Sequence, residues 1–126
     1  MKKKVAIIGS GIAGLTLANF LQASSKFEFI VYEKERTLNL NEGFGIQLST
    51  NGISILNKIG FGQLNKNEKY CPSKLDFYSI NFNKICDLDL TTFNSTNEKY
   101  TTLKRSTLIN FLKENLLTNS IIFGKK

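Results

Sequence analysis

The first part of the chain alternates short apolar runs with a helical pattern. Val5–Ile8 is a continuous apolar run typical of a short buried strand, and Phe29–Tyr32 is a second one. Between them, Leu15, Ala18 and Leu21 recur at helical spacing. This order predicts a strand, a helix and a second strand parallel to the first, which is the βαβ unit of an α/β fold.

A glycine turn and an acidic residue frame this unit. Residues 9–14 read Gly-Ser-Gly-Ile-Ala-Gly, and Glu33 directly follows the second strand. In a G-x-G-x-x-G turn the glycines permit the tight turn, the approach of a pyrophosphate and close helix packing, while the acid accepts ribose hydroxyls and would repel a 2′-phosphate. The pattern predicts a dinucleotide site that disfavours NADP. Its candidate cofactor-binding residues are Gly9, Ser10, Gly11, Ile12, Ala13, Gly14 and Glu33.

Beyond this unit, Thr37–Glu42 is polar and is predicted to be a loop. Ile53, Leu56 and Ile59 then have helical spacing, and Gly60 is placed to end that helix in the left-handed conformation. The apolar positions of Leu75–Leu90, on either side of a turn-prone stretch, predict a β-hairpin with an uncertain register.

A third helix and a third strand are predicted near the end of the sequence. The helix follows Lys104–Thr107, and the buried strand, parallel to the first two, covers Ser120–Phe123. A small sheet with so few helices leaves apolar side chains uncovered, so we expect marginal solubility. The apolar face of the helix consists of Leu108, Phe111, Leu112 and Leu116.

Composition limits the function classes. The 126 residues carry a formal net charge of +7. The lysines are scattered and accompany no nucleic-acid motif, which favours a solvated basic surface over nucleic-acid binding. The absence of histidine excludes histidine-based catalysis and most catalytic zinc sites, so no metal site is expected. No apolar stretch is long enough for a transmembrane helix.

The cysteines and the N-terminus bear on the compartment. Cys71 and Cys86 have no metal-ligand spacing, and we expect each to be a small buried side chain in a protein of the reducing cytoplasm. Lys2–Lys4 and the apolar residues after them resemble a secretory signal. The three glycines within that stretch and the position of Glu33 favour the dinucleotide unit instead.

Four segments together resemble a known family. They are residues 9–18, residues 31–34, the stretch 43–52 that is similar to G-x-G-I-x-L-x-x-N-G, and residues 104–108 with an R-x-x-L pattern. In this order they resemble the N-terminal part of class A FAD-dependent monooxygenases, the p-hydroxybenzoate-hydroxylase-like aromatic hydroxylases. The resemblance implies a Rossmann-like, glutathione-reductase-like FAD-binding domain, incomplete, with an inserted β-hairpin at about residues 74–90 that corresponds to part of a substrate-domain sheet.

The resemblance also implies roles for individual residues. Glu33 would take the adenosine ribose of FAD, Lys34 would lie near the adenine, and Arg105 would approach the cofactor from its helix. A guanidinium beside a dianionic cofactor is a strong charge-assisted donor, which agrees with that role. Arg36 is a weaker candidate, and solvation at the surface is the preferred interpretation. The family further implies NAD(P)H as electron donor and a small-molecule, aromatic-type substrate in a full-length protein.

The sequence also departs from the family. Family members are much longer and carry later Asp-Gly and Gly-Asp segments that contact FAD, together with most of the substrate pocket. We therefore expect residues 1–126 to be an FAD-binding segment of a flavoprotein monooxygenase, truncated and not catalytically complete alone, with no catalytic residue identified. The alternatives are another FAD oxidoreductase, reductase- or halogenase-like, and a non-catalytic remnant. An NAD-dependent enzyme is disfavoured, since residues 43–52 and 104–108 have no role in it.

Overall fold

The computed structural model describes residues 1–38, 40 and 43–125, and the molecule divides into two compact units. The first unit comprises residues 1–44 and 104–126, and the second comprises residues 45–103. The predicted loop over Thr37–Glu42 includes residues 39, 41 and 42, which lie outside the described residues. The elements of the first unit are β1 (Lys3–Ile8), α1 (Ile12–Ala23), β2 (Phe27–Tyr32), α3 (Arg105–Glu114) and β8 (Ile121–Ile122).

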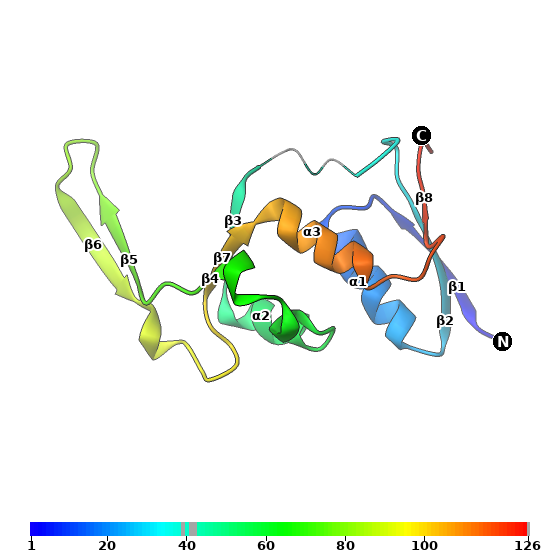
Figure 1. Ribbon diagram of the computed structural model, residues 1–126, viewed down its shortest axis with the longest axis horizontal. Helices are drawn as coiled ribbons and strands as arrows, with labels where there is room; N and C mark the ends of the chain where they lie inside the picture. The colour runs from blue at the N-terminus through cyan, green and yellow to red at the C-terminus, as the bar shows by residue number, and fades with distance from the viewer. Residues whose placement is uncertain (39, 41–42, 126) are drawn as a thin grey trace. The chain divides into compact units, whose positions relative to one another are not determined.

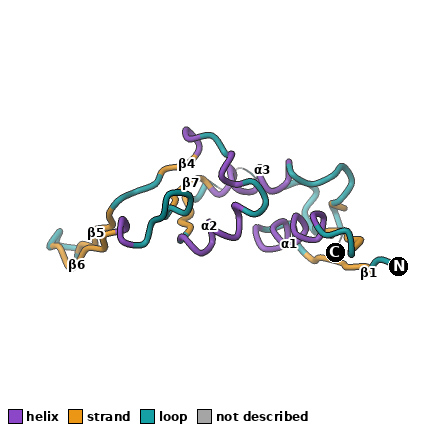
Figure 2. The backbone as a smooth tube through the Cα atoms, turned by 90° about the horizontal axis from the view of Figure 1, so that it is seen from below, coloured by secondary structure: helices purple, strands orange, loops and turns teal. Residues whose placement is uncertain are grey.

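The first unit is a parallel sheet in the order β1–β2–β8, with α1 packed on β1 and β2 and with α3 packed on α1 (Figures 1 and 2). The register of the first strand pair runs from Lys3 opposite Phe27 to Ile8 opposite Tyr32. β8 adds to β2 in parallel, with Val31 opposite Ile121. The predicted βαβ unit and the predicted third parallel strand are therefore confirmed.

The core of the first unit forms where the helices meet the sheet. Ile7, Ala18 and Val31 are its buried centre, and Leu21 and Ile121 pack against it. Phe111, which the sequence pattern placed on the apolar face of α3, is only half-buried, and Ile109 is buried instead. α3 ends at Glu114, although Leu116 still packs on the core as its apolar spacing predicted. The buried side chains of α3 are Leu108, Ile109 and Leu112.

The strands are less buried than their apolar runs predicted. Ile7 is buried in β1, whereas its neighbour Ile8 is 83% exposed, and Ile30 in β2 is 38% exposed. β8 is half-buried on both residues. Successive side chains of a strand point to opposite faces, and within the described part of this unit the helices cover one face only. The expectation of fully buried strands was wrong for this reason.

The second unit contains a three-stranded sheet, one α-helix and a hairpin. Its sheet has the order β3–β7–β4, with β4 antiparallel to β7. α2 buries Ile53 and Leu56, and Gly60 has φ of 93° after the helix, which confirms the predicted left-handed residue. The elements are β3 (Gly45–Leu48), α2 (Thr50–Asn57), η1 (Phe61–Gln63), η2 (Lys66–Glu68), β4 (Lys69–Tyr70), β5 (Lys74–Tyr78), β6 (Lys84–Asp89), η3 (Leu90–Thr92) and β7 (Thr101–Lys104), whose last residue belongs to the first unit.

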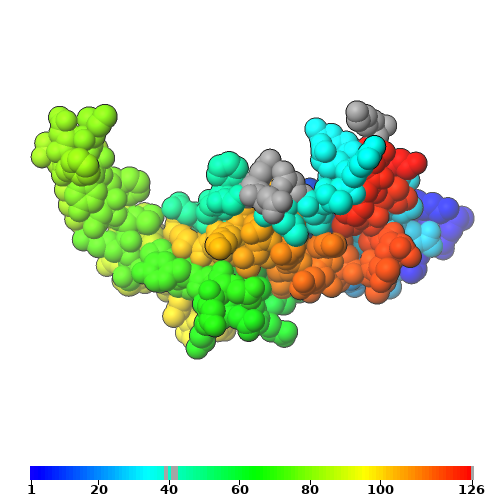
Figure 3. Space-filling model, turned by 45° about the horizontal axis from the view of Figure 1, so that its top comes forward, coloured from blue at the N-terminus to red at the C-terminus, as the bar shows by residue number. Residues whose placement is uncertain are grey.

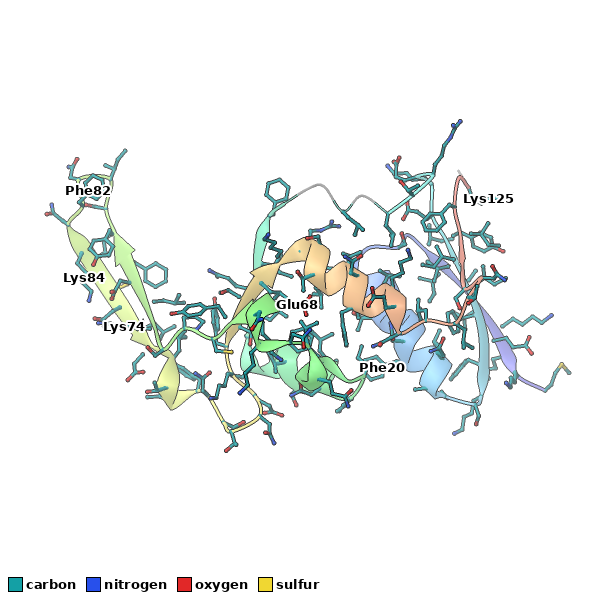
Figure 4. The ribbon with its side chains drawn as sticks, in the orientation of Figure 1. Phe20, Glu68, Lys74, Phe82, Lys84 and Lys125 are labelled. Carbon is teal, nitrogen blue, oxygen red and sulfur yellow. The ribbon has the colours of Figure 1, made fainter. Side chains whose placement is uncertain are left out.

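The predicted hairpin is present as β5 and β6, which pair antiparallel with a register shift between Phe77 and Tyr78. Lys84 contacts the carboxylates of Asp76 and Asp87 at 2.9 and 2.6 Å, and Lys74 contacts the same two acids at 3.4 and 3.0 Å (Figure 4). The Lys84–Asp76 and Lys74–Asp87 pairs join the two strands, and the other two pairs each lie within one strand. The assignment of the hairpin to a substrate domain stays a prediction.

The two cysteines are free and exposed, which corrects the expectation that they are buried. Cys71 lies in the connection after β4, where its sulfur is 3.5 Å from the hydroxyl oxygen of Thr101. Cys86 lies on the hairpin opposite Phe77, which is itself exposed. A two-stranded ribbon has no second layer of its own, so a small apolar residue on it stays in contact with solvent.

Candidate functional site

The glycine turn has the geometry that its sequence predicts. Gly9 has φ of 94°, a conformation that favours glycine, and its N–H donates to the carbonyl of Tyr32 at 2.8 Å. A Cβ atom on Gly14 would lie 2.1 Å from the carbonyl oxygen of Gly9 and 3.3 Å from the side chain of Ile7. α1 therefore approaches the end of β1 more closely than any other residue at position 14 would permit.

The N-terminus of α1 opens beside this turn. The first helical hydrogen bond runs from the N–H of Leu15 to the carbonyl of Gly11 at 2.9 Å. Residues 12–14 lie before the donor of that first bond. Helix geometry therefore leaves their N–H groups without a hydrogen-bond partner within the helix. In the described part of the chain no side chain caps this helix start. Backbone donors and the positive end of the helix dipole favour an anion there.

Glu33 lies at the carboxyl end of β2 and is fixed against the turn. Its Oε2 accepts hydrogen bonds from both the N–H and the Oγ of Ser10, each at 2.7 Å. Its Oε1 accepts one from the N–H of Glu35 at 3.0 Å. The two bonds from Ser10 join residues 23 positions apart, so the carboxylate that the sequence placed near the turn is bonded directly to it.

These donors keep Glu33 ionised. The N–H of Glu35, then the hydroxyl of Ser10 and its N–H, lower the pKa of Glu33 from 4.5 to about 2, against a smaller opposing effect of burial. A hydrogen bond to the charged form favours that form. Glu33 is therefore an acceptor over the whole physiological pH range.

Arg105 faces the same site from α3. It is the first residue of that helix, and its N–H donates to the carbonyl of Phe44 at 2.8 Å. A cavity of about 280 Å³ in the first unit brings it together with the turn and the acid. The lining residues of this cavity are Ser10, Gly11, Glu33, Glu35, Thr37, Leu38, Arg105 and Ile109.

A second cavity of the first unit, of about 740 Å³, lies at the carboxyl ends of β1 and β2. Lys34 lines it, and its Nζ is 3.8 Å from Oε1 of Glu35. The backbone after β8 runs along the residues that follow β2, since Lys125 donates its N–H to the carbonyl of Glu33 at 2.9 Å (Figures 3 and 4). The cavity is lined by Ile8, Gly9, Tyr32, Glu33, Lys34 and Lys125.

The structure thus groups the candidate residues around Glu33. Ser10, Gly11 and Arg105 share one cavity with it, and Gly9 and Lys34 share the other, while Ile12, Ala13 and Gly14 form the first turn of α1. Arg36 is exposed, in agreement with its interpretation as a solvated residue.

Sequence reasoning missed Glu35 and Lys125. Their signal was available, because both follow predicted parallel strands, and the carboxyl ends of such strands share one edge of a sheet. Within the described residues, no group of three His, Cys, Asp or Glu side chains could hold a metal ion. Nor does any helix in that part of the chain have the length and apolar character needed to cross a membrane.

Comparison with protein families and curated proteins identifies similar sequences. Residues 7–41, which include the glycine turn and Glu33, match the family described as NAD(P)-binding Rossmann-like domain. The FAD-dependent monooxygenase anuJ of Penicillium roqueforti (strain FM164) is 45% identical over 58 residues, which are 45% of this chain and 7% of that protein. The 3-amino-4-hydroxybenzoate 2-monooxygenase PtnB3 of Streptomyces platensis is 42% identical over 59 residues, which are 47% of this chain and 14% of that protein.

Solved structures show the same fold. The tetrameric form of 2-methyl-3-hydroxypyridine-5-carboxylic acid oxygenase matches with a TM-score of 0.80 at 20% identity, over 98% of this chain and 32% of that one. Klebsiella pneumoniae HpxO complexed with FAD and uric acid matches with a TM-score of 0.77 at 21% identity, over 98% and 31%. This chain therefore spans about a third of those structures. In sequence and fold it resembles the N-terminal FAD-binding part of class A monooxygenases, as predicted.

Proposed function

We propose that this chain, which resembles the N-terminal part of FAD-dependent monooxygenases, binds the ADP half of FAD at its glycine turn. The observation that carries the proposal is the carboxylate of Glu33, which the N–H of Glu35 and then Ser10 keep ionised at the edge of a cavity that Gly11 and Arg105 also line. An acceptor for ribose, open backbone donors for phosphate and a guanidinium are what the ADP moiety of a dinucleotide requires.

Residues 9–14 form the proposed pyrophosphate cradle. An added Cβ atom on Gly11 would meet no atom within 4 Å, so the turn is open at the point where a phosphate has to approach the backbone. The N–H groups at the start of α1 donate to the phosphate oxygens. Arg105 adds positive charge from the start of α3 in the same cavity.

Glu33 binds the adenosine ribose in this proposal, and Lys34 lies on the adenine side. Lys34 shares the second cavity with the side chains of Ile8 and Tyr32, which supply apolar and aromatic surface for a planar base. A 2′-phosphate would meet the negative charge of Glu33, so the proposed site takes FAD rather than a 2′-phosphorylated dinucleotide.

The activity proposed for the whole protein is FAD-dependent monooxygenation of a small-molecule substrate, aromatic by family resemblance, with NAD(P)H as electron donor. The flavin would supply the oxidation–reduction chemistry, and residues of this chain would bind and orient its ADP half. The stretches that match the two relatives above make up 7% and 14% of those proteins, which supports the role of one segment of such an enzyme. The relatives' names favour a monooxygenase over the reductase- and halogenase-like alternatives.

Two further assignments accompany this proposal. The hairpin over residues 74–90 contributes to a substrate-domain sheet in a longer protein, because a two-stranded ribbon is marginally stable without further strands or a covering layer. The protein functions in the cytoplasm, because Cys71 and Cys86 are both free thiols, as is usual in a reducing compartment.

The test is direct titration of the purified 126-residue chain with FAD, followed by flavin absorbance and fluorescence. Glu33→Ala should weaken binding by about tenfold or more, since a hydrogen bond to a charged group contributes about 1.5–3 kcal/mol. The matched control is Glu28→Ala, an exposed glutamate of β2, which should bind like the unchanged chain. Equal affinity of the Glu33→Ala variant and the unchanged chain, or no flavin binding, would overturn the proposal.

The whole-protein activity needs a separate measurement. A longer protein that contains this segment should oxidise NAD(P)H faster when its substrate is present, and Arg105→Ala should weaken its hold on FAD. Arg36→Ala is the matched control, because Arg36 is an exposed arginine of the same unit. Flavin loss to the same extent in both variants would count against the role of Arg105.

A further inference from the structure

We propose that Ser10 is a positioning residue, which holds Oε2 of Glu33 so that Oε1 is the oxygen presented to the ribose. The inference rests on the proposed FAD site and adds to it a role for Ser10 distinct from contact with phosphate.

The two carboxylate oxygens of Glu33 accept different numbers of hydrogen bonds within the protein. Oε2 accepts from both the N–H and the Oγ of Ser10 at 2.7 Å, whereas Oε1 accepts from the N–H of Glu35 at 3.0 Å. Each carboxylate oxygen has two lone pairs. Ser10 thus takes both acceptor positions of Oε2, whereas the one hydrogen bond described for Oε1 leaves that oxygen a further acceptor position.

Ser10 is suited to this role because it is itself fixed. It is 4% exposed and forms part of the turn between β1 and α1, so its hydroxyl cannot move far from Glu33. An alanine or glycine at position 10 would keep the N–H bond and lose the Oγ bond. A side chain already held in its binding geometry loses less conformational freedom when the ligand binds.

The same bonds control the charge of Glu33. The N–H of Glu35 and then the hydroxyl of Ser10 are the main causes of its lowered pKa. The other charged groups near it are Lys34 and the carboxylate of Glu35 on its own segment, Arg105 on α3 and Lys125 after β8. None of them changes when Ser10 is replaced, so the effect of that replacement can be assigned to the hydroxyl.

The first test measures the pKa of the Glu33 carboxyl by carbon-detected NMR and needs no ligand. In the unchanged chain it should be about 2, and in Ser10→Ala it should move upward towards 4.5. Ser10→Gly, a second variant that keeps the N–H, should give the same rise. Ser25→Ala is the matched control, an exposed serine between α1 and β2, and should leave the pKa unchanged. An unchanged pKa in folded Ser10→Ala would overturn the inference.

The second test measures FAD affinity against pH. Ser10→Ala should bind up to about tenfold more weakly at neutral pH, because a Glu33 side chain that the hydroxyl no longer holds loses more conformational freedom when FAD binds. The ratio of the two affinities should grow as pH falls from about 4.5 towards about 2, because the carboxylate of the variant is protonated first. Glu33→Gln should cost less in the Ser10→Ala background than alone, since the two residues act as a unit.

The two tests separate the two ideas. If no form of the chain binds FAD, the proposed function fails, while the NMR titration still decides whether Ser10 controls Glu33. FAD can also bind with an affinity ratio of the unchanged chain to Ser10→Ala that is constant with pH, and with additive effects of Ser10→Ala and Glu33→Gln. In that case Ser10 does not position Glu33, and the proposed FAD site is retained.

Discussion

Gly14 and Gly9 are in such close contact that a single added carbon atom at Gly14 would overlap the carbonyl oxygen of Gly9 at 2.1 Å. That carbonyl belongs to backbone at a positive φ, which is fixed by the hydrogen bond from Gly9 to Tyr32. It cannot move aside without breaking the connection between β1 and β2. The glycine turn is therefore a requirement of the fold as well as a candidate ligand site.

Gly14→Ala should destabilise the first unit by about 3 kcal/mol or more, because overpacking against fixed backbone costs 1–3 kcal/mol even where neighbours can adjust. Urea unfolding monitored by circular dichroism measures the change. Gly52→Ala is the control: this glycine lies within α2, an added Cβ would meet no atom within 4 Å, and the variant should gain up to about 1 kcal/mol in helix propensity. Equal stability of Gly14→Ala and the unchanged chain would contradict the packing described.

Asn19 provides a second prediction. It is 5% exposed, and its Nδ2 donates to the carbonyls of Leu15 and Leu112, both at 2.8 Å, so it joins α1 to the last turn of α3. Asn19→Ala should lower the free energy of unfolding by about 2 kcal/mol, because it leaves the carbonyl of Leu112 buried without this donor. The control Asn110→Ala, at a half-buried position of α3, should change it by less than about 0.5 kcal/mol.

These two contacts show what the sequence could and could not predict. The role of Gly14 followed from the spacing of the glycines, because the turn connects neighbouring elements in a known geometry. Asn19 had no such signal. Its partner Leu112 is 93 residues away, and a polar residue on a predicted helix face cannot be matched to a distant carbonyl from periodicity alone.

The same distinction holds at the site. The position of Glu33 beside the turn was predictable, since its place after the second strand fixes it at the carboxyl edge. The pair of hydrogen bonds from Ser10 to one oxygen of Glu33 was not predictable, because it depends on side-chain rotamers. The exposure of Cys71 and Cys86 was missed for a different reason: composition favours burial of cysteine, and only the tertiary arrangement shows that no layer of the second unit covers them.

The hairpin should respond to acid. The hydrogen bond from Lys84 is the main cause that lowers the pKa of Asp87 from 3.8 to about 2, and it lowers that of Asp76 as well. Carboxylates with a lowered pKa stabilise the hairpin above pH 3.8, and this contribution to stability is lost as the pH falls towards 2. Amide protection in β5 and β6 should therefore decrease across that window. The effect should be small and should weaken with salt, because the pairs are exposed.

Lys84→Met tests this assignment. The pKa of Asp87 should rise towards 3.8, and the loss of protection in acid should shrink, because one of its two lysine partners is gone. Lys99→Met, an exposed lysine of the same unit outside the ion-pair network, should leave both quantities unchanged. A pKa of Asp87 that stays near 2 in Lys84→Met would mean that Lys74 alone accounts for the shift.

Ile30 and Val31 are neighbours in β2 that lie on opposite faces of the sheet, 38% and 0% exposed. Val31→Lys should unfold the first unit, at a cost above about 3 kcal/mol, because it places an unpaired charge in the core. Ile30→Lys should keep the fold, because Ile30 is not in the core. It should raise the highest concentration at which light scattering still finds a monomer, because it removes exposed apolar surface. If Ile30→Lys unfolds the chain as Val31→Lys does, the face that carries Ile30 is covered in solution, and the expectation of marginal solubility from an uncovered sheet face is wrong.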